Sequence, residues 1–298
     1  MTTTSMNPLQ IFTTDSWQAP FSDEEQNNAL TELEMGKILY FPQLAFSLAN
    51  DERIFLSPQY ADPTSKNISF HAPTKKLWGI QHAADEERLR LKSMLNRYTE
   101  HATNLIKTAM PRYSSALIVG RTSFRPVQID GRISSYRKDD KRLHVDAFPS
   151  APNQGKRILR VFSNINPHDE SRVWRIGEPF VDAVKHFLPK LREPVPGHAT
   201  LLRFLKITKS RRSLYDHFML QLHDQMKADE HYQKHAPQNE IHFPVNSSWI
   251  VQTDHVSHAA MRGQYVLEQT FYLPVSAMQN ELYSPLRILE QRIGRRLA

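Results

Sequence analysis

The sequence contains no cysteine, and this absence removes several kinds of chemistry at once. Disulfide bonds, thiolate metal sites, iron–sulfur clusters and cysteine nucleophiles are all excluded. Long apolar runs are absent too, since no stretch approaches the roughly 18 uninterrupted apolar residues of a membrane-spanning helix. Residues 1–20 lack the basic and apolar regions of a secretion signal. These absences predict a soluble, cytoplasmic protein.

The charge balance is basic and indicates an anionic partner. Lys and Arg number 38 against 31 Asp and Glu, which gives a formal net charge of +7. Such a surplus favours association with nucleic acid, anionic lipid head groups or acidic small molecules. No basic run is interleaved with aromatic residues, so we do not expect a nucleic-acid partner. The hydrophobic content of 40% is enough for a substantial core.

The apolar pattern changes along the chain from helical spacing to short strands. Residues 1 to about 30 are polar and irregular, 36–46 form a strand that a proline ends, and 82–110 form a long amphipathic helix. Further helices are expected over 181–189, 213–233 and, from Ser284 with Pro285 at its first position, the C-terminus. Short strands are predicted over 115–120, 124–129, 131–137, 142–148, 157–165, 240–245, 247–259 and 264–275.

This layout predicts a mostly β protein with flanking helices, in a single domain over 1–298. We expect an N-terminal extension over 1–114, a β core over 115–275 with a helical insertion at about 181–233, and a basic C-terminal helix within 276–298. Leu286, Leu289 and Ile293 share one side of that helix, and four arginines make it basic. It is either a membrane-surface anchor or an ordinary helix that packs on the domain.

One pair of residues near the end of a predicted strand has the spacing of metal ligands. In "RLHVDAFPS", His144 and Asp146 point to the same face of an extended segment. His258, from a distant strand, would complete a two-histidine, one-carboxylate site, which leaves three coordination positions open and suits a 2-oxoglutarate oxygenase. His255 is a rival ligand that should face the opposite way. In the alternative interpretation Asp146 orients His144 or caps a turn, and His258 is a core residue.

Longer strings carry a family resemblance. "RISSYRKDDKRLHVDAFPSAPNQGKRILRVFSNINP", "VWRIGEPF", "YDHFMLQLHDQMKADEHYQKHAPQ" and "WIVQTDHVSHAAMRGQYVLEQTFYLP" resemble the Kdo 3-hydroxylase family of Fe(II)/2-oxoglutarate dioxygenases. The resemblance implies a double-stranded β-helix (jelly-roll) with helices packed on the major sheet, and the ligands His144, Asp146 and His258. It also implies Fe(II), the co-substrate 2-oxoglutarate, and O2.

The same resemblance implies a substrate and a location. The family acts on the Kdo sugar of lipopolysaccharide, so the expected reaction is hydroxylation at C3 of Kdo in Kdo-lipid A, which forms Ko. The expected partner is therefore an inner-core glycolipid, with peripheral contact to the cytoplasmic face of the inner membrane.

The distal carboxylate of 2-oxoglutarate needs a cation at a fixed distance, and arginine supplies two parallel donors. Many oxygenases place this cation about ten residues after the distal histidine, where this chain has Glu268 and Gln269. Arg160, on a strand beside the His144–Asp146 pair, is the better candidate, while Arg157 would face out. Alternatively, Arg160 pairs with an acidic neighbour across the sheet.

Further residues are candidates for substrate binding and for orienting a ligand. Arg125, Arg172, Trp174 and Arg175 are expected to bind the sugar and its anionic groups, although each could be an ordinary surface or core residue. Asp254 and Gln269 are expected to orient His258.

Rival functions remain open at this point. They are a cupin-like isomerase or hydrolase with zinc or manganese, a non-catalytic carbohydrate-binding jelly-roll, and a nucleic-acid or protein demethylase.

Overall fold

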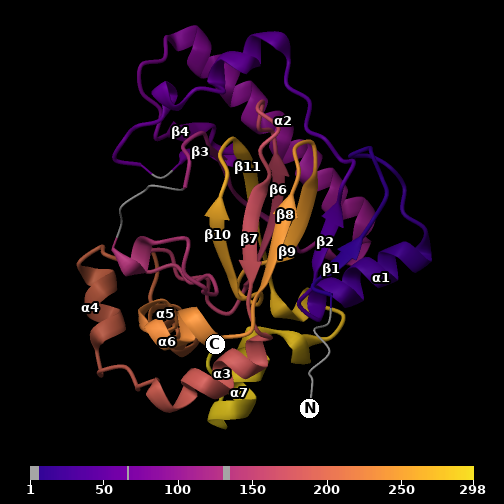
Figure 1. Cartoon of the computed structure of the whole chain (residues 1–298). Coiled ribbons are helices and arrows are strands. Elements are labelled where there is room, and N and C mark those ends of the chain that lie inside the picture. The colour runs from indigo at the N-terminus through magenta and orange to yellow at the C-terminus, as the bar shows by residue number, and fades with distance from the viewer. Residues whose placement is uncertain (1–6, 66, 130–134) are drawn as a thin grey trace.

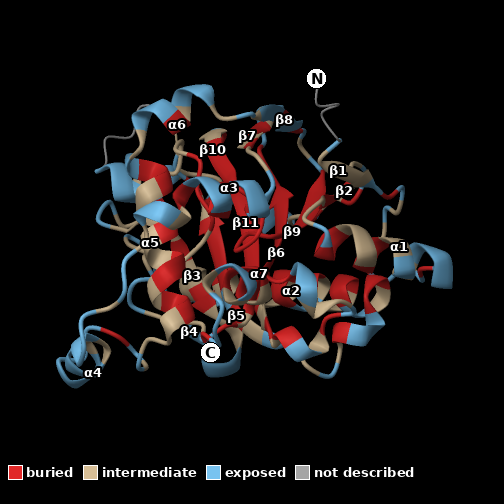
Figure 2. Ribbon diagram, turned by 90° about the horizontal axis from the view of Figure 1, so that it is seen from below, coloured by how far each residue is buried: buried red, intermediate tan, exposed pale blue. Residues whose placement is uncertain are grey.

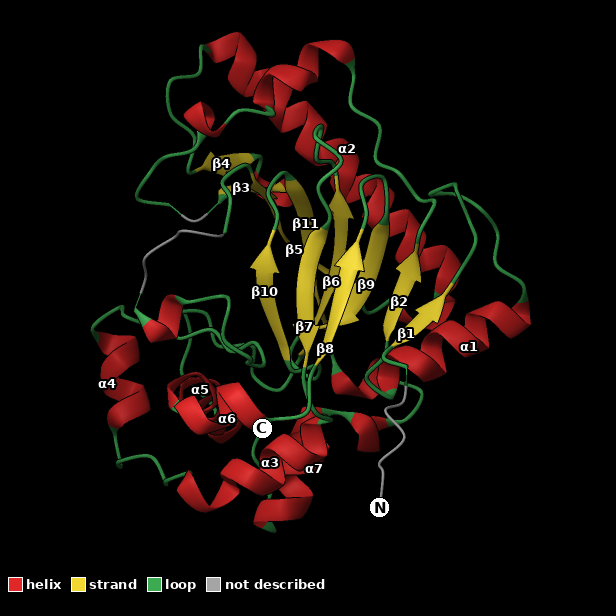
Figure 3. Cartoon of the chain, in the orientation of Figure 1, coloured by secondary structure: helices red, strands yellow, loops and turns green. Residues whose placement is uncertain are grey.

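Two β-sheets face each other in the computed structural model, which describes residues 7–65, 67–129 and 135–298 (Figure 3). The strands of the larger sheet lie in the order β1 (Leu9–Ile11), β2 (Ile38–Phe41), β9 (Ser248–Gln252), β6 (Arg157–Asn164), β11 (Val266–Leu273), β5 (Ile118–Arg125), β3 (Ile68–His71) and β4 (Lys76–Trp78). The smaller sheet has the order β10 (His258–Arg262), β7 (Arg172–Ile176) and β8 (Asn239–Phe243). All pairs are antiparallel except β1 with β2, as the predicted double-stranded β-helix requires.

Helices cover the outer face and one end of this framework (Figure 1). They are α1 (Asp23–Glu34), α2 (Asp85–Ala109), α3 (Phe180–Phe187), α4 (His198–Phe204), α5 (Leu214–Ala228), α6 (Glu230–His235) and α7 (Pro285–Ile293). α2 packs on β5 and β11, and its Tyr98 hydroxyl donates to the carbonyl of Val161 at 3.1 Å. Burial is concentrated in the strands and in the helix faces turned to them (Figure 2). The major sheet is thus covered by helices, as predicted.

The structure corrects several predicted elements near the chain start and in the helical insertion. Residues 23–34 are helical, and Ser22 and Glu25 form a capping box that the sequence analysis overlooked. The helix expected over 213–233 is divided at Asp229, whose carboxylate accepts from the N–H of Tyr232 and caps α6. α4 was not predicted. The strand expected over 131–137 falls mainly outside the described residues, and Tyr136–Lys138 form a 3-10 turn.

The C-terminal helix begins where the sequence predicts, with the Ser284 side chain accepting from the N–H of Arg287. Its apolar residues Leu286, Ile288 and Leu289 are buried in the main core. Packing on the domain therefore accounts for this helix, and its apolar side is not free to enter a membrane. No helix of the described residues has the length and apolar character needed to cross a bilayer.

Candidate metal centre

Backbone hydrogen bonds bring the three predicted ligands together. His144 forms an isolated antiparallel bridge with His258, with N–H to carbonyl distances of 3.0 and 2.9 Å. Two residues on, the N–H of Asp146 donates to the carbonyl of Thr253 at 2.8 Å. One ligand atom from each of the three side chains lies within 4.8 Å of the others. The predicted triad is confirmed, although this bridge replaces the longer strand expected over 142–148.

Both imidazoles present the same nitrogen to the centre of the triad. Nδ1 of His144 lies 2.7 Å from the carbonyl of Arg142, and Nδ1 of His258 lies 2.8 Å from the carbonyl of Val256. A carbonyl only accepts hydrogen bonds, so each Nδ1 carries the proton. Each Nε2 therefore keeps its lone pair for a metal, which is the usual second-shell arrangement of ligating histidines.

The charge states of the triad also suit a metal. Burial lowers the pKa of His144 well below its ordinary value, and the nearby His258 adds to the effect; burial likewise lowers the pKa of His258. Burial would raise the pKa of Asp146, but the positive charge of Arg160 and the nearby His258 and Thr253 together outweigh it and the pKa is lowered. Two neutral imidazoles and one carboxylate fit a divalent iron that keeps open positions.

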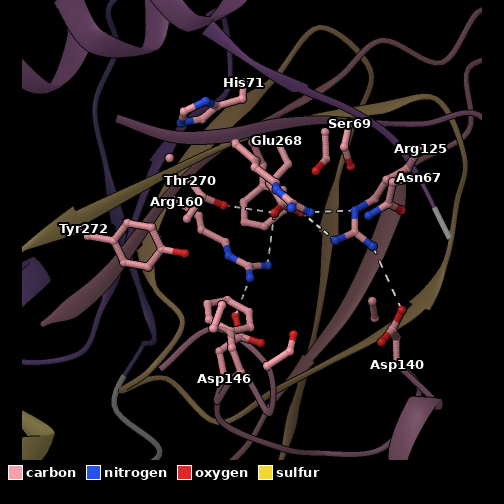
Figure 4. Close-up of a pocket in the computed structure, with 18 of the residues that line it drawn as sticks. Asn67, Ser69, His71, Arg125, Asp140, Asp146, Arg160, Glu268, Thr270 and Tyr272 are labelled. Carbon is pink, nitrogen blue, oxygen red and sulfur yellow. Dashed lines mark hydrogen bonds and ion pairs between the residues drawn. The ribbon is translucent and has the colours of Figure 1, made fainter. Parts of the chain in front are cut away.

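The triad opens into a cavity of about 740 Å³ between the two sheets. Glu268 lies in this cavity and joins two arginines through its two oxygens (Figure 4). Oε2 accepts from Nε of Arg125 at 3.1 Å, and Oε1 lies 3.1 Å from Nη1 of Arg160. Burial acts to raise the pKa of Glu268, but Arg125 and Arg160 outweigh it and the pKa is lowered. The cavity wall therefore contains a charged Arg–Glu–Arg cluster.

Arg160 enters the cavity beside the triad, as the strand alternation predicts. Its Nη2 lies 3.0 Å from Oδ2 of Asp146, and its guanidinium lies over the ring of Phe148. Arg157 points to the opposite face of β6, out of the barrel, as expected. It is fully buried beneath the helices and its Nε donates to Oδ2 of Asp254 at 2.8 Å.

The two residues expected to orient His258 are engaged elsewhere. Asp254 pairs with Arg157, and Val256 supplies the carbonyl that holds the His258 ring. Gln269 lies on the helix-covered face of β11, where its side chain accepts from the hydroxyl of Thr122. The two predictions are wrong for different reasons. Asp254 lies in a turn over 253–257 between β9 and β10 rather than in a continuous strand, so alternation across 247–259 does not hold. Gln269 lies on the face of β11 that is turned away from the cavity.

His255, the rival ligand, lies in that turn and away from the metal site. Its ring is buried against Phe180, and burial lowers its pKa to about 3.

Three of the four residues expected to bind substrate line the cavity. Arg125 and Arg172 contribute cations, and burial lowers the pKa of Arg172 to about 9. Trp174 stacks on the His258 ring at 5.1 Å and is only 2% exposed, so it forms apolar floor next to the triad. Arg175 points to the other side of β7, beside Glu240, and does not line the cavity.

No sequence pattern predicted the wall that β3, β4 and β5 build at the outer end of the cavity. Trp78 is 41% exposed there, and the guanidinium of Arg121 lies 5.1 Å from the centre of its ring. Asn67 and Ser69 add polar groups to the cavity lining, near Arg125 (Figure 4). In the sequence, the only hint of this wall is Trp78, a tryptophan that directly follows two lysines and a leucine.

A double-stranded β-helix with this triad at the inner end of a cationic cavity is the architecture of the non-haem Fe(II)/2-oxoglutarate dioxygenases. Comparison with known protein families narrows this class of enzymes to one family. A family model described as "3-deoxy-D-manno-oct-2-ulosonic acid (Kdo) hydroxylase" matches residues 16–296. The chain belongs to this Kdo hydroxylase family.

Solved structures agree with the family model. The Kdo hydroxylase KdoO in complex with cobalt(II) is 48% identical, with a TM-score of 0.96 over 98% of this chain and 97% of that chain. The same enzyme with α-ketoglutarate and Fe(III) gives 48% identity and a TM-score of 0.95 over 98% of each chain. Its complex with succinate and Fe(III) gives 48% identity and a TM-score of 0.94, over 98% of this chain and 97% of that chain. A comparison with curated proteins finds no match.

Proposed function

We propose that this chain hydroxylates C3 of Kdo in Kdo-lipid A, using Fe(II), 2-oxoglutarate and O2, and so forms Ko. The observation that carries the proposal is the His144–Asp146–His258 triad at the inner end of an arginine-lined cavity. Membership of the Kdo hydroxylase family supports the choice of substrate.

His144 and His258 would hold the iron through Nε2, and Asp146 through its carboxylate. The bound iron supplies the oxidation of a C–H bond by O2, with 2-oxoglutarate converted to succinate and carbon dioxide. The stacked ring of Trp174 covers one side of the His258 ring. The three side chains occupy one side of the site, and the other side faces the cavity, where co-substrate and sugar can approach.

Arg160 is the proposed partner of the 2-oxoglutarate C5 carboxylate. It is the arginine that contacts the triad itself, and both of its terminal nitrogens face acids in the cavity. Its Nε is buried without a hydrogen-bond partner among the described residues. Thr270, which pairs with Arg160 across the sheet, and Tyr272 bring hydroxyl groups to the same part of the cavity. The co-substrate carboxylate would replace Asp146 or Glu268 as one partner of the guanidinium.

Arg125 and Arg172 are the proposed partners of the Kdo carboxylate. Burial lowers the pKa of Arg172, so a bound anion would restore the stability of its charged form. Its Nε has no hydrogen-bond partner among the described residues. The exposed face of Trp78 would contact the next part of the glycolipid, since tryptophan gives a sugar ring an apolar surface.

Two measurements test this function. Anaerobic addition of Fe(II) and 2-oxoglutarate should produce a weak visible charge-transfer band, which a zinc-dependent isomerase or a pure binding protein would lack. Incubation with Kdo-lipid A in air should then add one oxygen atom to the sugar, as read by mass spectrometry. The variant His144→Ala is the control and should lose both signals. If the charge-transfer band appears but the mass of the glycolipid does not change, the enzyme acts on another substrate, such as the methylated nucleic acid or protein of a demethylase.

A further inference from the structure

Residues 194–215 combine exposed apolar side chains with positive charge in a way that no other described segment does. Sixteen large hydrophobic residues are exposed in the described part of the chain, and five of them lie here: Val195, Leu201, Phe204, Leu205 and Ile207. The same 22 positions contain five Lys or Arg and no Asp or Glu. The segment therefore carries a charge of +5 within a chain of net charge +7.

The structure presents this apolar surface to the outside. α4 stands apart from the sheets at the side of the molecule (Figure 1) and its residues are largely exposed (Figure 2). Leu201, Phe204 and Leu205 have the spacing of one helix face, and their exposed fractions are 53%, 81% and 54%. Arg203 falls on the opposite face, and the exposed Lys206 follows the C-terminal end of the helix. The amphipathic turn thus has its apolar side directed away from the protein core.

The charge of the segment identifies what would cover it. Arg203, Lys206, Lys209 and Arg211 are exposed, and none forms an ion pair with a carboxylate of the described residues. An apolar turn surrounded by free cations fits an anionic lipid surface, where apolar side chains enter the interface and cations meet head groups. A second copy of the same face would bring like charges together. The lipid surface is therefore the favoured partner.

The segment leads directly to the mouth of the cavity. Its Thr208 is buried, and the N–H of Lys209 donates to the carbonyl of Ser150 at 2.9 Å. Both Lys209 and Ser150 line the cavity that contains the triad. A membrane lying against α4 would therefore bring its head groups to the cavity mouth.

We propose that residues 195–212 form a membrane-docking segment. This segment binds the protein to an anionic lipid surface and brings the sugar head group of a membrane-embedded glycolipid to the cavity. The lipid-binding part stands on the geometry of this segment, and the presentation of glycolipid rests on the proposed function. The basic C-terminal helix is not the anchor, because its apolar residues are buried.

The test is sedimentation of the full-length protein with vesicles of phosphatidylethanolamine and phosphatidylglycerol. The wild type should bind these vesicles and bind pure phosphatidylcholine vesicles at least tenfold more weakly. Phe204→Ser with Leu205→Ser should lower binding to the anionic vesicles at least tenfold. Leu282→Ser removes an equally exposed leucine elsewhere (72% exposed) and should leave binding unchanged. Circular dichroism confirms that each variant is folded.

A charge variant completes the comparison. Arg203→Glu with Lys206→Glu should also lower binding at least tenfold, whereas Lys107→Glu, on exposed α2 surface, should not. Absence of wild-type binding, or binding that the Phe204 and Leu205 changes leave intact, would overturn the proposal. A shift from dimer to monomer in those variants without any change in vesicle binding would overturn it in favour of a second copy of the chain.

Activity separates this proposal from the proposed function. The Phe204→Ser, Leu205→Ser variant should lose at least tenfold in turnover of Kdo-lipid A in vesicles, and should keep wild-type turnover of the deacylated, water-soluble Kdo oligosaccharide. Equal losses on both substrates would overturn the docking role. A wild type that binds vesicles but oxidises neither substrate would refute the proposed function and leave the lipid-binding segment supported.

Discussion

Arg160 is the residue at which the proposed chemistry is most directly tested. Replacing it by alanine removes a charged donor beside the triad, and such hydrogen bonds contribute about 1.5–3 kcal/mol. We expect Arg160→Ala to raise the apparent requirement for 2-oxoglutarate about 10- to 100-fold while the protein still binds iron. The measurement is turnover against 2-oxoglutarate concentration, with metal content read in parallel. Arg121→Ala, at the outer wall, is the control, and an unchanged co-substrate dependence would rule out Arg160 as the partner.

His255 should make the stability of the protein depend on pH. Its pKa is about 3 in the folded state against an ordinary 6.5, so between these values the unfolded chain binds the additional proton. Stability from this group is therefore present above pH 6.5 and is lost as the pH falls towards 3, by up to ~1.4 kcal/mol per pH unit.

Urea unfolding at pH 7 and pH 5 measures this effect. His255→Gln should show a smaller loss between the two conditions than the wild type, whereas His242→Gln, at a half-exposed position, should behave like the wild type. An equal loss of unfolding free energy between pH 7 and pH 5 in His255→Gln and in the wild type would contradict the assignment of this effect to His255.

Single residues were predictable where local geometry fixes them. Alternation along a strand gave Arg160 its place in the cavity, and the spacing of His144 and Asp146 gave the triad. Asp254 and Gln269 were misassigned because a turn interrupts the expected strand and because neighbours across the sheet, not along it, decide a side chain's partner. The two arginines that pair with Glu268 come from two other strands, and the sequence alone does not show which strands are neighbours or in what register they pair.

At the scale of elements, the turn over 253–257 connects the outer face of the large sheet to the metal site. Asp254 in this turn pairs with Arg157, and both side chains are fully buried. Thr253 in the same turn accepts from the N–H of Asp146. The ion pair thus fixes the segment that positions one ligand and leads into another, His258.

Removing one member of this pair should be costly. Asp254→Ala leaves a buried arginine without its partner, and we expect a loss of about 3–5 kcal/mol in the free energy of unfolding. Denaturant unfolding measures it. Glu193→Ala breaks the exposed pair with Arg295 and should cost under about 1 kcal/mol. A loss of similar size in both variants would show that the buried ion pair contributes no more to the free energy of unfolding than the exposed pair does.

The elements missed from the sequence are the short ones. Long periodic patterns predicted α2 and its boundaries well, because many apolar residues repeat on one face. α1 has few apolar residues, and its capping box was the available signal. α4 was not predicted because the apolar pattern was used to find helices that pack on the core, and the apolar face of α4 does not pack on the core.

At the scale of the whole molecule, the net charge of +7 should govern encounter with an anionic glycolipid. Cations at the cavity and on the docking segment act over about a Debye length, ~8 Å at physiological ionic strength. We expect the apparent KM for Kdo-lipid A to rise several-fold as sodium chloride increases, with little change in kcat. The Arg203→Glu, Lys206→Glu variant should show a weaker salt dependence. A KM that does not respond to salt in the wild type would contradict electrostatic steering.

The overall architecture followed from the order of helical and strand patterns together with the family resemblance. The shape of the cavity did not follow from either. Its walls come from strands of both sheets, and its outer end uses β3 and β4, which the sequence analysis left unassigned. Cavity geometry depends on how sheets twist and close, which no local pattern encodes.

The two ligand histidines are oriented by peptide carbonyls located two residues earlier in the chain. A carbonyl is present whatever amino acid occupies position 142 or 256. The tautomer that exposes Nε2 therefore does not depend on which side chains occupy these two positions. In sites where a carboxylate side chain orients the imidazole ring, a single substitution can remove that hydrogen bond. Substitutions at positions 142 and 256 should therefore leave the protonation pattern of the two ligands unchanged.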